Sequence, residues 1–88
     1  MTSVPVRVEI FSRPNCHLCD EAKAAIERVR KRTRLGFDLN VVNIETDPKL
    51  EREFGTDIPV VFVNGQKAFK YRVDEIEFEK RLKRLWKT

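Results

Sequence analysis

The stretch VRVEIFSRPNCHLC (residues 6–19) joins an alternating apolar segment to the only two cysteines of the chain. Apolar residues alternate with polar ones around Val8 and Ile10, which predicts a buried strand that ends near Ser12. From Cys16 onward the apolar residues recur at helical spacing, and we expect one helix face to carry them: Leu18, Ala22, Ala25, Ile26 and Val29. The two cysteines are therefore expected where a strand passes into a helix.

The rest of the chain divides into segments with clear boundaries. The first helix should fray near Thr33 and stop by Gly36. A strand (37–44) and a short helix (45–55) follow, and the short helix has Asp47 as its cap, Pro48 at its first position and Gly55 at its end.

Two apolar runs in IPVVFVNGQKAFKY (58–71) flank Asn64-Gly65, a pair that predicts a tight hairpin. The last segment (74–87) is predicted to be a helix, with Asp74 and Glu77 as a capping box.

The order β-α-β-α-β-β-α predicts an α/β fold in a single domain (1–88). The first β-α-β crossover makes the first two strands parallel, and the hairpin adds two antiparallel ones. We expect a mixed four-stranded sheet with helices on both faces.

The composition is that of an ordinary soluble domain: 88 residues, 41% hydrophobic and 36% charged. No apolar stretch is long enough to cross a membrane, and the N-terminus does not resemble a secretory signal. Two cysteines are too few for a disulfide framework, so we expect a reducing, cytoplasmic location and no membrane partner.

The net charge of +4 comes from two local clusters, RVRKRTR (28–34) and KRLKRLWKT (80–88). Cations are favoured at helix C-termini by the helix dipole, and no aromatic residues interleave the first cluster. We therefore expect no nucleic-acid partner. Nothing in the sequence asks for an oligomer, so we expect a monomer.

The cysteine spacing suits a reactive dithiol. A helix N-terminus lowers the pKa of a thiol there, so Cys16 is expected to be the exposed nucleophile. Cys19, one turn inside the helix, is expected to be buried and to resolve the mixed disulfide. Arg13 adds positive charge nearby, whereas Asp20 and Glu21 oppose a thiolate. His17 either assists Cys16 or is a solvent-facing spacer.

Two other interpretations of the pair remain open. A structural zinc or iron–sulfur site needs more ligands than one chain supplies from Cys16, Cys19 and His17, so a metal carrier would require a dimer or an external ligand. A structural disulfide across so short a loop would stabilise the fold only weakly.

The chain resembles the thioredoxin fold, and within it most closely a glutaredoxin-like protein. The resemblance rests on the strand that leads into the Cys-x-x-Cys pair, and on IPVVFV with its hairpin about 40 residues later. Glutaredoxins carry a basic residue and a proline before the first cysteine, as Arg13-Pro14 stand here. The resemblance implies a cis peptide at Ile58-Pro59 facing the cysteines, with Ile58 free to pair with an extended substrate. Alternatively, Pro59 is a strand-start proline without a substrate role.

The chain also departs from that family. The cysteines flank His17-Leu18 instead of Pro-Tyr, and Lys70-Tyr71 stand where a Gly-Gly turn precedes the glutathione-binding acids. Asp74 remains as a candidate glutathione contact, or as a helix cap only. Arg13 is likewise a candidate contact for a glutathione carboxylate, or a solvated loop residue.

The sequence thus predicts a thiol–disulfide oxidoreductase of the glutaredoxin-like kind. Its expected partners are disulfide-containing or glutathionylated proteins. No bound cofactor is expected, and glutathione is a candidate reductant. The alternatives are a non-catalytic thioredoxin-like binding module and a metal or iron–sulfur carrier.

Overall fold

The structure, a computed structural model, describes residues 6–86, and its elements follow the predicted order. The elements are β1 (Arg7–Ser12), α1 (His17–Thr33), β2 (Asp38–Asn43), a 3-10 turn (Ile44–Thr46), α2 (Pro48–Phe54), β3 (Val60–Val63), β4 (Gln66–Lys70) and α3 (Glu75–Trp86). The start of the N-terminal segment (1–5) and the end of the second basic cluster (Lys87 and Thr88) lie outside the described residues.

The strands form one mixed sheet in the order β2-β1-β3-β4. β1 runs parallel to β2 and antiparallel to β3, and β3 runs antiparallel to β4. The hairpin turns at Asn64 and Gly65, both at positive φ (49° and 81°), as the Asn-Gly pair predicts. The predicted α/β architecture is therefore confirmed.

The helix ends follow local side-chain chemistry. The Asp47 carboxylate accepts a hydrogen bond from the backbone N–H of Lys49 (2.9 Å), and Pro48 begins α2. Asp74 accepts from the N–H of Glu77 (3.1 Å) before α3. At the C-terminus of α1, Arg34 rather than a glycine adopts the left-handed conformation, and its N–H donates to the carbonyl of Arg30.

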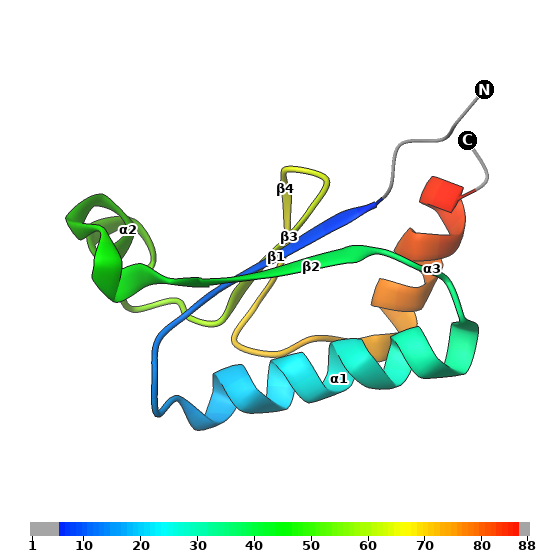
Figure 1. Cartoon of the computed structure of the whole chain (residues 1–88), viewed down its shortest axis with the longest axis horizontal. Coiled ribbons are helices and arrows are strands. Elements are labelled where there is room, and N and C mark those ends of the chain that lie inside the picture. Colours follow the sequence, from blue (N-terminus) through cyan, green and yellow to red (C-terminus); the bar gives the residue numbers. More distant parts are fainter. Residues whose placement is uncertain (1–5, 87–88) are drawn as a thin grey trace.

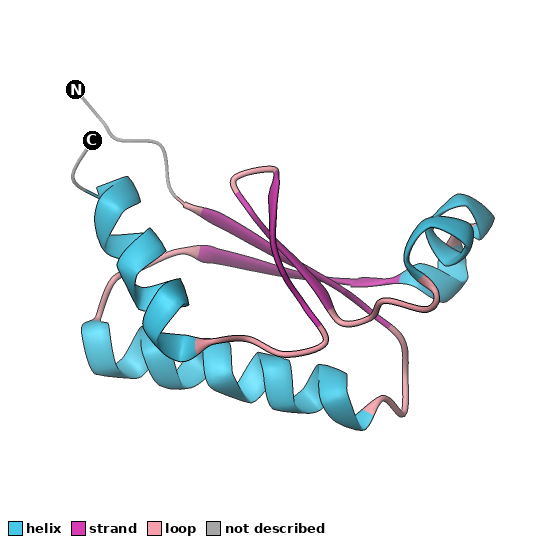
Figure 2. Ribbon diagram, turned by 180° about the vertical axis from the view of Figure 1, so that it is seen from behind, coloured by secondary structure: helices cyan, strands magenta, loops and turns pink. Residues whose placement is uncertain are grey.

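Helices α1 and α3 lie on the same face of the sheet, as Figures 1 and 2 show from opposite sides. The main core forms between them and the strands, with these buried residues at its centre: Val8, Ile10, Ile26, Val29, Val61, Val63, Phe78 and Leu82. The expectation that Leu18 belongs to the apolar face of the first helix is wrong. Leu18 is exposed, and Cys19 takes the buried position in that turn.

The second face of the sheet is covered only at one end, where α2 lies (Figure 1). Phe54 of α2 packs with Ile44 and Val60, and its ring stacks on Phe11 at 4.7 Å between centroids. Helices thus cover both faces, as predicted, but unequally.

Three arginines of the first basic segment (28–34) have side-chain partners within the fold. Arg28 pairs with Glu75 (2.9 Å), and Arg32 pairs with Glu75 (3.3 Å) and Glu79 (3.0 Å) on α3. Arg30 lies over the ring of Phe37. The pairs with Glu75 and Glu79 join α1 to α3, and they agree with the interpretation of the cluster as a structural helix end. Across residues 6–86, no helix has the length and apolarity needed to cross a membrane.

Candidate dithiol site

The site begins where β1 ends and the chain turns into α1. Pro14 and Asn15 form the turn, and Asn15 adopts positive φ (59°), which asparagine tolerates better than most residues. The turn places Cys16 at the N-cap of α1. The predicted position of the cysteines at a strand-to-helix junction is confirmed.

Cys16 and Cys19 form a disulfide, with their Cα atoms 5.2 Å apart. Cys16 is partly buried, whereas Cys19 is only 1% exposed. The Sγ atom of Cys16 accepts a hydrogen bond from the backbone N–H of Cys19 (3.2 Å). Both this bond and the positive end of the helix dipole favour negative charge on Cys16 when the pair is reduced.

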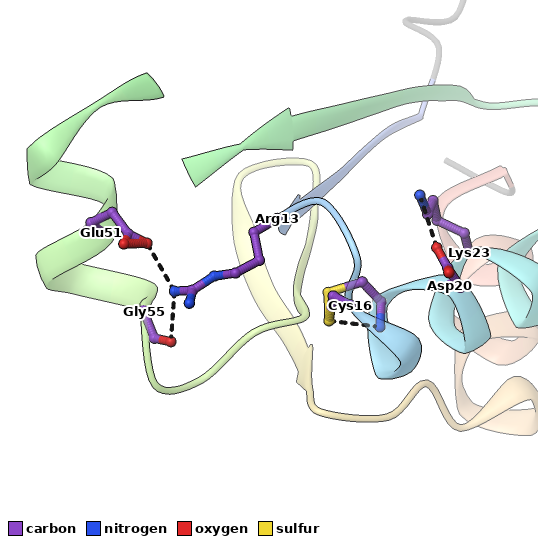
Figure 3. The surroundings of a disulfide bond; sticks show 7 residues. Arg13, Cys16, Asp20, Lys23, Glu51 and Gly55 are labelled. Carbon is purple, nitrogen blue, oxygen red and sulfur yellow. Dashed lines mark hydrogen bonds and ion pairs between the residues drawn. A yellow bond between two sulfur atoms is a disulfide. The ribbon is translucent and has the colours of Figure 1, made fainter. Parts of the chain in front are cut away.

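Arg13 extends away from the cysteines toward α2 (Figure 3). Its guanidinium donates to the Glu51 carboxylate (2.8 Å) and to the carbonyl of Gly55 (3.1 Å). Arg13 therefore ties the loop before Cys16 to α2, and its charge is already paired. Sequence reasoning missed this contact because Glu51 lies far along the chain and belongs to an otherwise ordinary helix.

The other charged residues near the cysteines pair along the helix surface. The imidazole of His17, whose side chain is 85% exposed, lies 3.2 Å from the Glu21 carboxylate. Asp20 lies 3.5 Å from Lys23 (Figure 3). The position of His17 agrees with the solvent-facing interpretation, and both carboxylates have partners on their own helix.

Ile58-Pro59 is a cis peptide bond, as the resemblance implied. The register of β1 with β3 pairs Phe11 with Val60. The 58–59 segment therefore lies beside the C-terminal end of β1, where the chain turns toward Cys16. Within residues 6–86, the backbone of Ile58 makes no hydrogen bond. Its N–H and carbonyl are therefore available to an extended peptide.

Tyr71 crosses over the segment that precedes Ile58. Its N–H donates to the carbonyl of Pro59 (2.8 Å), and its hydroxyl lies 3.1 Å from Asp57 Oδ1 and 3.3 Å from the carbonyl of Thr56. Lys70 lies over the Tyr71 ring. The sequence indicated that these two side chains replace a glycine turn, but it gave no sign of the contact with Asp57.

A groove of about 320 Å³ runs beside α1, starting one turn beyond the cysteine pair. Ala22 and Ala25 line it from α1, and Tyr71 lines it from the loop after β4. The Arg28–Glu75 pair lies along the same groove. Asp74, a predicted glutathione contact, caps α3 and does not line this groove.

The described residues offer no cluster of three or more histidine, cysteine or acidic side chains that could hold a metal ion. A structural zinc site takes four ligands, so one built on the cysteine pair would need further ligands from outside the described residues. No observation in residues 6–86 favours the metal-carrier interpretation over the dithiol.

Comparison with known proteins gives the family. The model of the Glutaredoxin-like domain (DUF836) matches residues 7–83. The chain belongs to this family. A relative from Mycobacterium tuberculosis, named only as an uncharacterized protein, is 30% identical over 74 residues, which cover 78% of this chain and 74% of the relative. A protein named Thioredoxin from Methanocaldococcus jannaschii is 28% identical over 65 residues (73% and 76% of the two chains).

Solved structures give the fold of this glutaredoxin-like chain. The solution structure of a Nitrosomonas europaea protein matches with a TM-score of 0.76 and 25% identity, covering 92% of this chain and 95% of that one. A chloroplastic thioredoxin z matches with a TM-score of 0.72 at 10% identity, over 96% of this chain and 80% of that one. The fold is thioredoxin-like, and together with the Cys-x-x-Cys pair it supports a redox function.

Proposed function

We propose that the protein is a cytoplasmic, monomeric thiol–disulfide oxidoreductase that reduces protein disulfides or glutathione mixed disulfides. The observation that carries the proposal is the position of the Cys16 sulfur at the N-terminus of α1, within bonding reach of Cys19 and hydrogen-bonded to its N–H. Likeness to a named thioredoxin supports the same chemistry.

The reaction proceeds in two exchanges. The Cys16 thiolate attacks one sulfur of the substrate disulfide, forming a mixed disulfide and releasing the first substrate thiolate. Cys19, as thiolate, then attacks the Cys16 sulfur and releases the second substrate thiolate. The substrate gains two electrons and, after protonation, two protons, while the protein becomes the Cys16–Cys19 disulfide. Two molecules of glutathione, or one dithiol reductant, regenerate the reduced pair.

The remaining groups of the site position the substrate. The unpaired backbone of Ile58 pairs with an extended segment that carries the disulfide, as in β-strand addition. On the side of the two sulfurs away from Ile58, the groove beside Ala22 and Ala25 receives atoms of the substrate chain. Because Tyr71 fills the turn next to Ile58, protein disulfides are the favoured substrates and glutathione the weaker one.

The test measures alkylation of the reduced protein by iodoacetamide as a function of pH, together with reduction of a protein disulfide. We expect Cys16 to react with an apparent pKa clearly below the ordinary value of about 8.5. Cys16→Ser should abolish reduction, and Cys19→Ser should trap the mixed disulfide. An ordinary Cys16 pKa combined with no reductase activity would contradict the proposal and leave a thioredoxin-like binding module as the function.

A further inference from the structure

A second groove, of about 400 Å³, lies between α3 and the β3–β4 turn. It is lined by Val63, Asn64, Gln66, Arg81, Arg84 and Leu85. Val63 pairs with Val8 near the start of β1, whereas the chain leaves for Cys16 after Ser12 at the other end of that strand. The groove therefore lies at the opposite end of the sheet from the cysteine pair.

The groove carries positive charge that the fold does not neutralise. Within residues 6–86, the guanidinium groups of Arg81 and Arg84 have no hydrogen bond or ion pair, and no acidic residue lines the groove. The acids of α3 are engaged elsewhere: Glu75 and Glu79 pair with arginines of α1, and Glu77 pairs with Lys80. Arginines three residues apart on a helix repel each other, so an anion between them would be favourable.

The hydrogen-bonding groups around the two arginines suit a phosphate. A guanidinium binds two oxygens of a phosphate at once, and a phosphomonoester has three terminal oxygens to share between two arginines and an amide. Asn64 Oδ1 already accepts from the N–H of Arg7, so the Asn64 amide nitrogen remains as a donor. The Gln66 side chain has no partner within the described part of the chain.

The size of the groove and its apolar lining residues indicate which class of molecule bears the phosphate group. Val63 and Leu85 supply apolar surface beside the charged groups, and ligand pockets of about 300–1,000 Å³ hold small molecules. We propose that the groove between α3 and the β3–β4 turn binds a small phosphorylated molecule, with Arg81 and Arg84 holding its phosphate. The site is independent of the dithiol chemistry.

The experiment is a titration of the ¹⁵N-labelled, reduced full chain, followed by NMR. The probes are ribose 5-phosphate, inorganic phosphate and, as a carboxylate, acetate. We expect ribose 5-phosphate to shift the Asn64 and Gln66 amide signals and the Arg81 and Arg84 side-chain signals saturably. It should bind more tightly than inorganic phosphate, and acetate should bind more weakly than both.

The test variants are Arg81→Gln and Arg84→Gln. Their matched control is Arg52→Gln, which removes an exposed arginine of α2 that has no partner in residues 6–86. Loss of one charge-assisted contact should weaken ribose 5-phosphate binding about tenfold, whereas Arg52→Gln should leave it unchanged. Preserved dispersion of the remaining signals shows that each variant is folded, and protein disulfide reduction should be unaffected in all three.

Three results would overturn the inference. The first is an absence of saturable shifts at the groove, and the second is equal weakening by Arg52→Gln. The third is displacement of ribose 5-phosphate by a phosphate-free, glutamate-rich peptide that binds more tightly, because the surface would then be a docking face for acidic proteins.

Discussion

Tyr71 stands where the resemblance to glutaredoxins places a glycine, in the loop after β4. It adopts positive φ (69°), which costs a non-glycine residue about 1–2 kcal/mol. Its bonds to Pro59, Asp57 and Thr56 offset that cost and fix the side chain over the segment before Ile58. The ring therefore occupies space that a glycine would leave open.

Replacing Tyr71 with glycine should open the site to glutathione. We expect Tyr71→Gly to raise kcat/KM for a glutathione mixed disulfide about fivefold, the equivalent of ~1 kcal/mol of relieved steric hindrance. Reduction of a protein disulfide should change little. Tyr71→Phe is the control, because it removes the hydroxyl and keeps the ring. An equal gain from both variants, or no gain from glycine, would show that the ring does not exclude glutathione.

Arg13 is expected to act on stability and not on the reactivity of Cys16. Arg13→Ala removes the bonds to Glu51 and to the Gly55 carbonyl, and we expect a loss of about 1 kcal/mol in the free energy of unfolding, since the pair is partly exposed. Arg52→Ala, on the helix α2 that carries Glu51, should cost less than about 0.5 kcal/mol. Urea denaturation gives both values. A shift in the pH profile of Cys16 alkylation in Arg13→Ala would instead assign Arg13 to the thiolate.

At the scale of elements, α1 and α3 are joined by ion pairs that shift the pKa values of their own groups. The hydrogen bond from Arg28 lowers the pKa of Glu75, with Arg32 adding to it. Hydrogen bonds from Lys83 and then Arg32 lower the pKa of Glu79. The bond from Glu79, followed by that from Glu75, raises the pKa of Arg32. Both carboxylates thus favour the folded state when they are ionised.

The sign of the pH dependence follows from these shifts. A carboxylate with a lowered pKa in the folded state stabilises the fold above its unfolded pKa, about 4.3, and loses this contribution as the pH falls through the folded value. We expect the double variant Glu75→Gln/Glu79→Gln to lower the urea midpoint at pH 7, with a deficit relative to the wild type that becomes smaller at about pH 3. Glu53→Gln, an exposed acid of α2, is the control and should show no such convergence. A deficit that is the same at both pH values would contradict the electrostatic explanation.

Across the whole molecule, the predictable features are those with a local cause. Alternation around Val8, the Asp47-Pro48 cap and the Asn64-Gly65 turn each act within a few residues, so the strands, helices and connections could be placed from the sequence. The position of Cys16 at a helix N-terminus follows from the same local pattern.

The features that the sequence did not indicate depend on residues that are distant along the chain. The partners of Arg28 and Arg32 lie 43 to 47 residues away, and those of Arg13 lie 38 and 42 residues away. The exposure of Leu18 has a related cause. Helical periodicity allows either Leu18 or Cys19 to face the sheet, and the docking of α1 turns Cys19 inward.

The stability of the whole fold depends most on the core that α1 and α3 share with the sheet, and Phe78 tests this dependence. Phe78 is fully buried, and its ring meets those of Phe37 and Phe69 edge-on at 5.6 and 6.3 Å between centroids. Phe78→Ala should lower the free energy of unfolding by about 3–5 kcal/mol. A chain of 88 residues has only ~4–13 kcal/mol in total.

The matched control for Phe78 lies two residues away on the same helix. Ile76 is 66% exposed, so Ile76→Ala should change the free energy of unfolding by less than about 0.5 kcal/mol in urea denaturation. Because α1 carries the cysteines and rests on the same core, disulfide reduction by Phe78→Ala should fall in proportion to the folded fraction. If a largely unfolded Phe78→Ala population kept full activity, residues 16–19 would react without the helix. The reactivity of Cys16 could then not be assigned to its position at the N-terminus of α1.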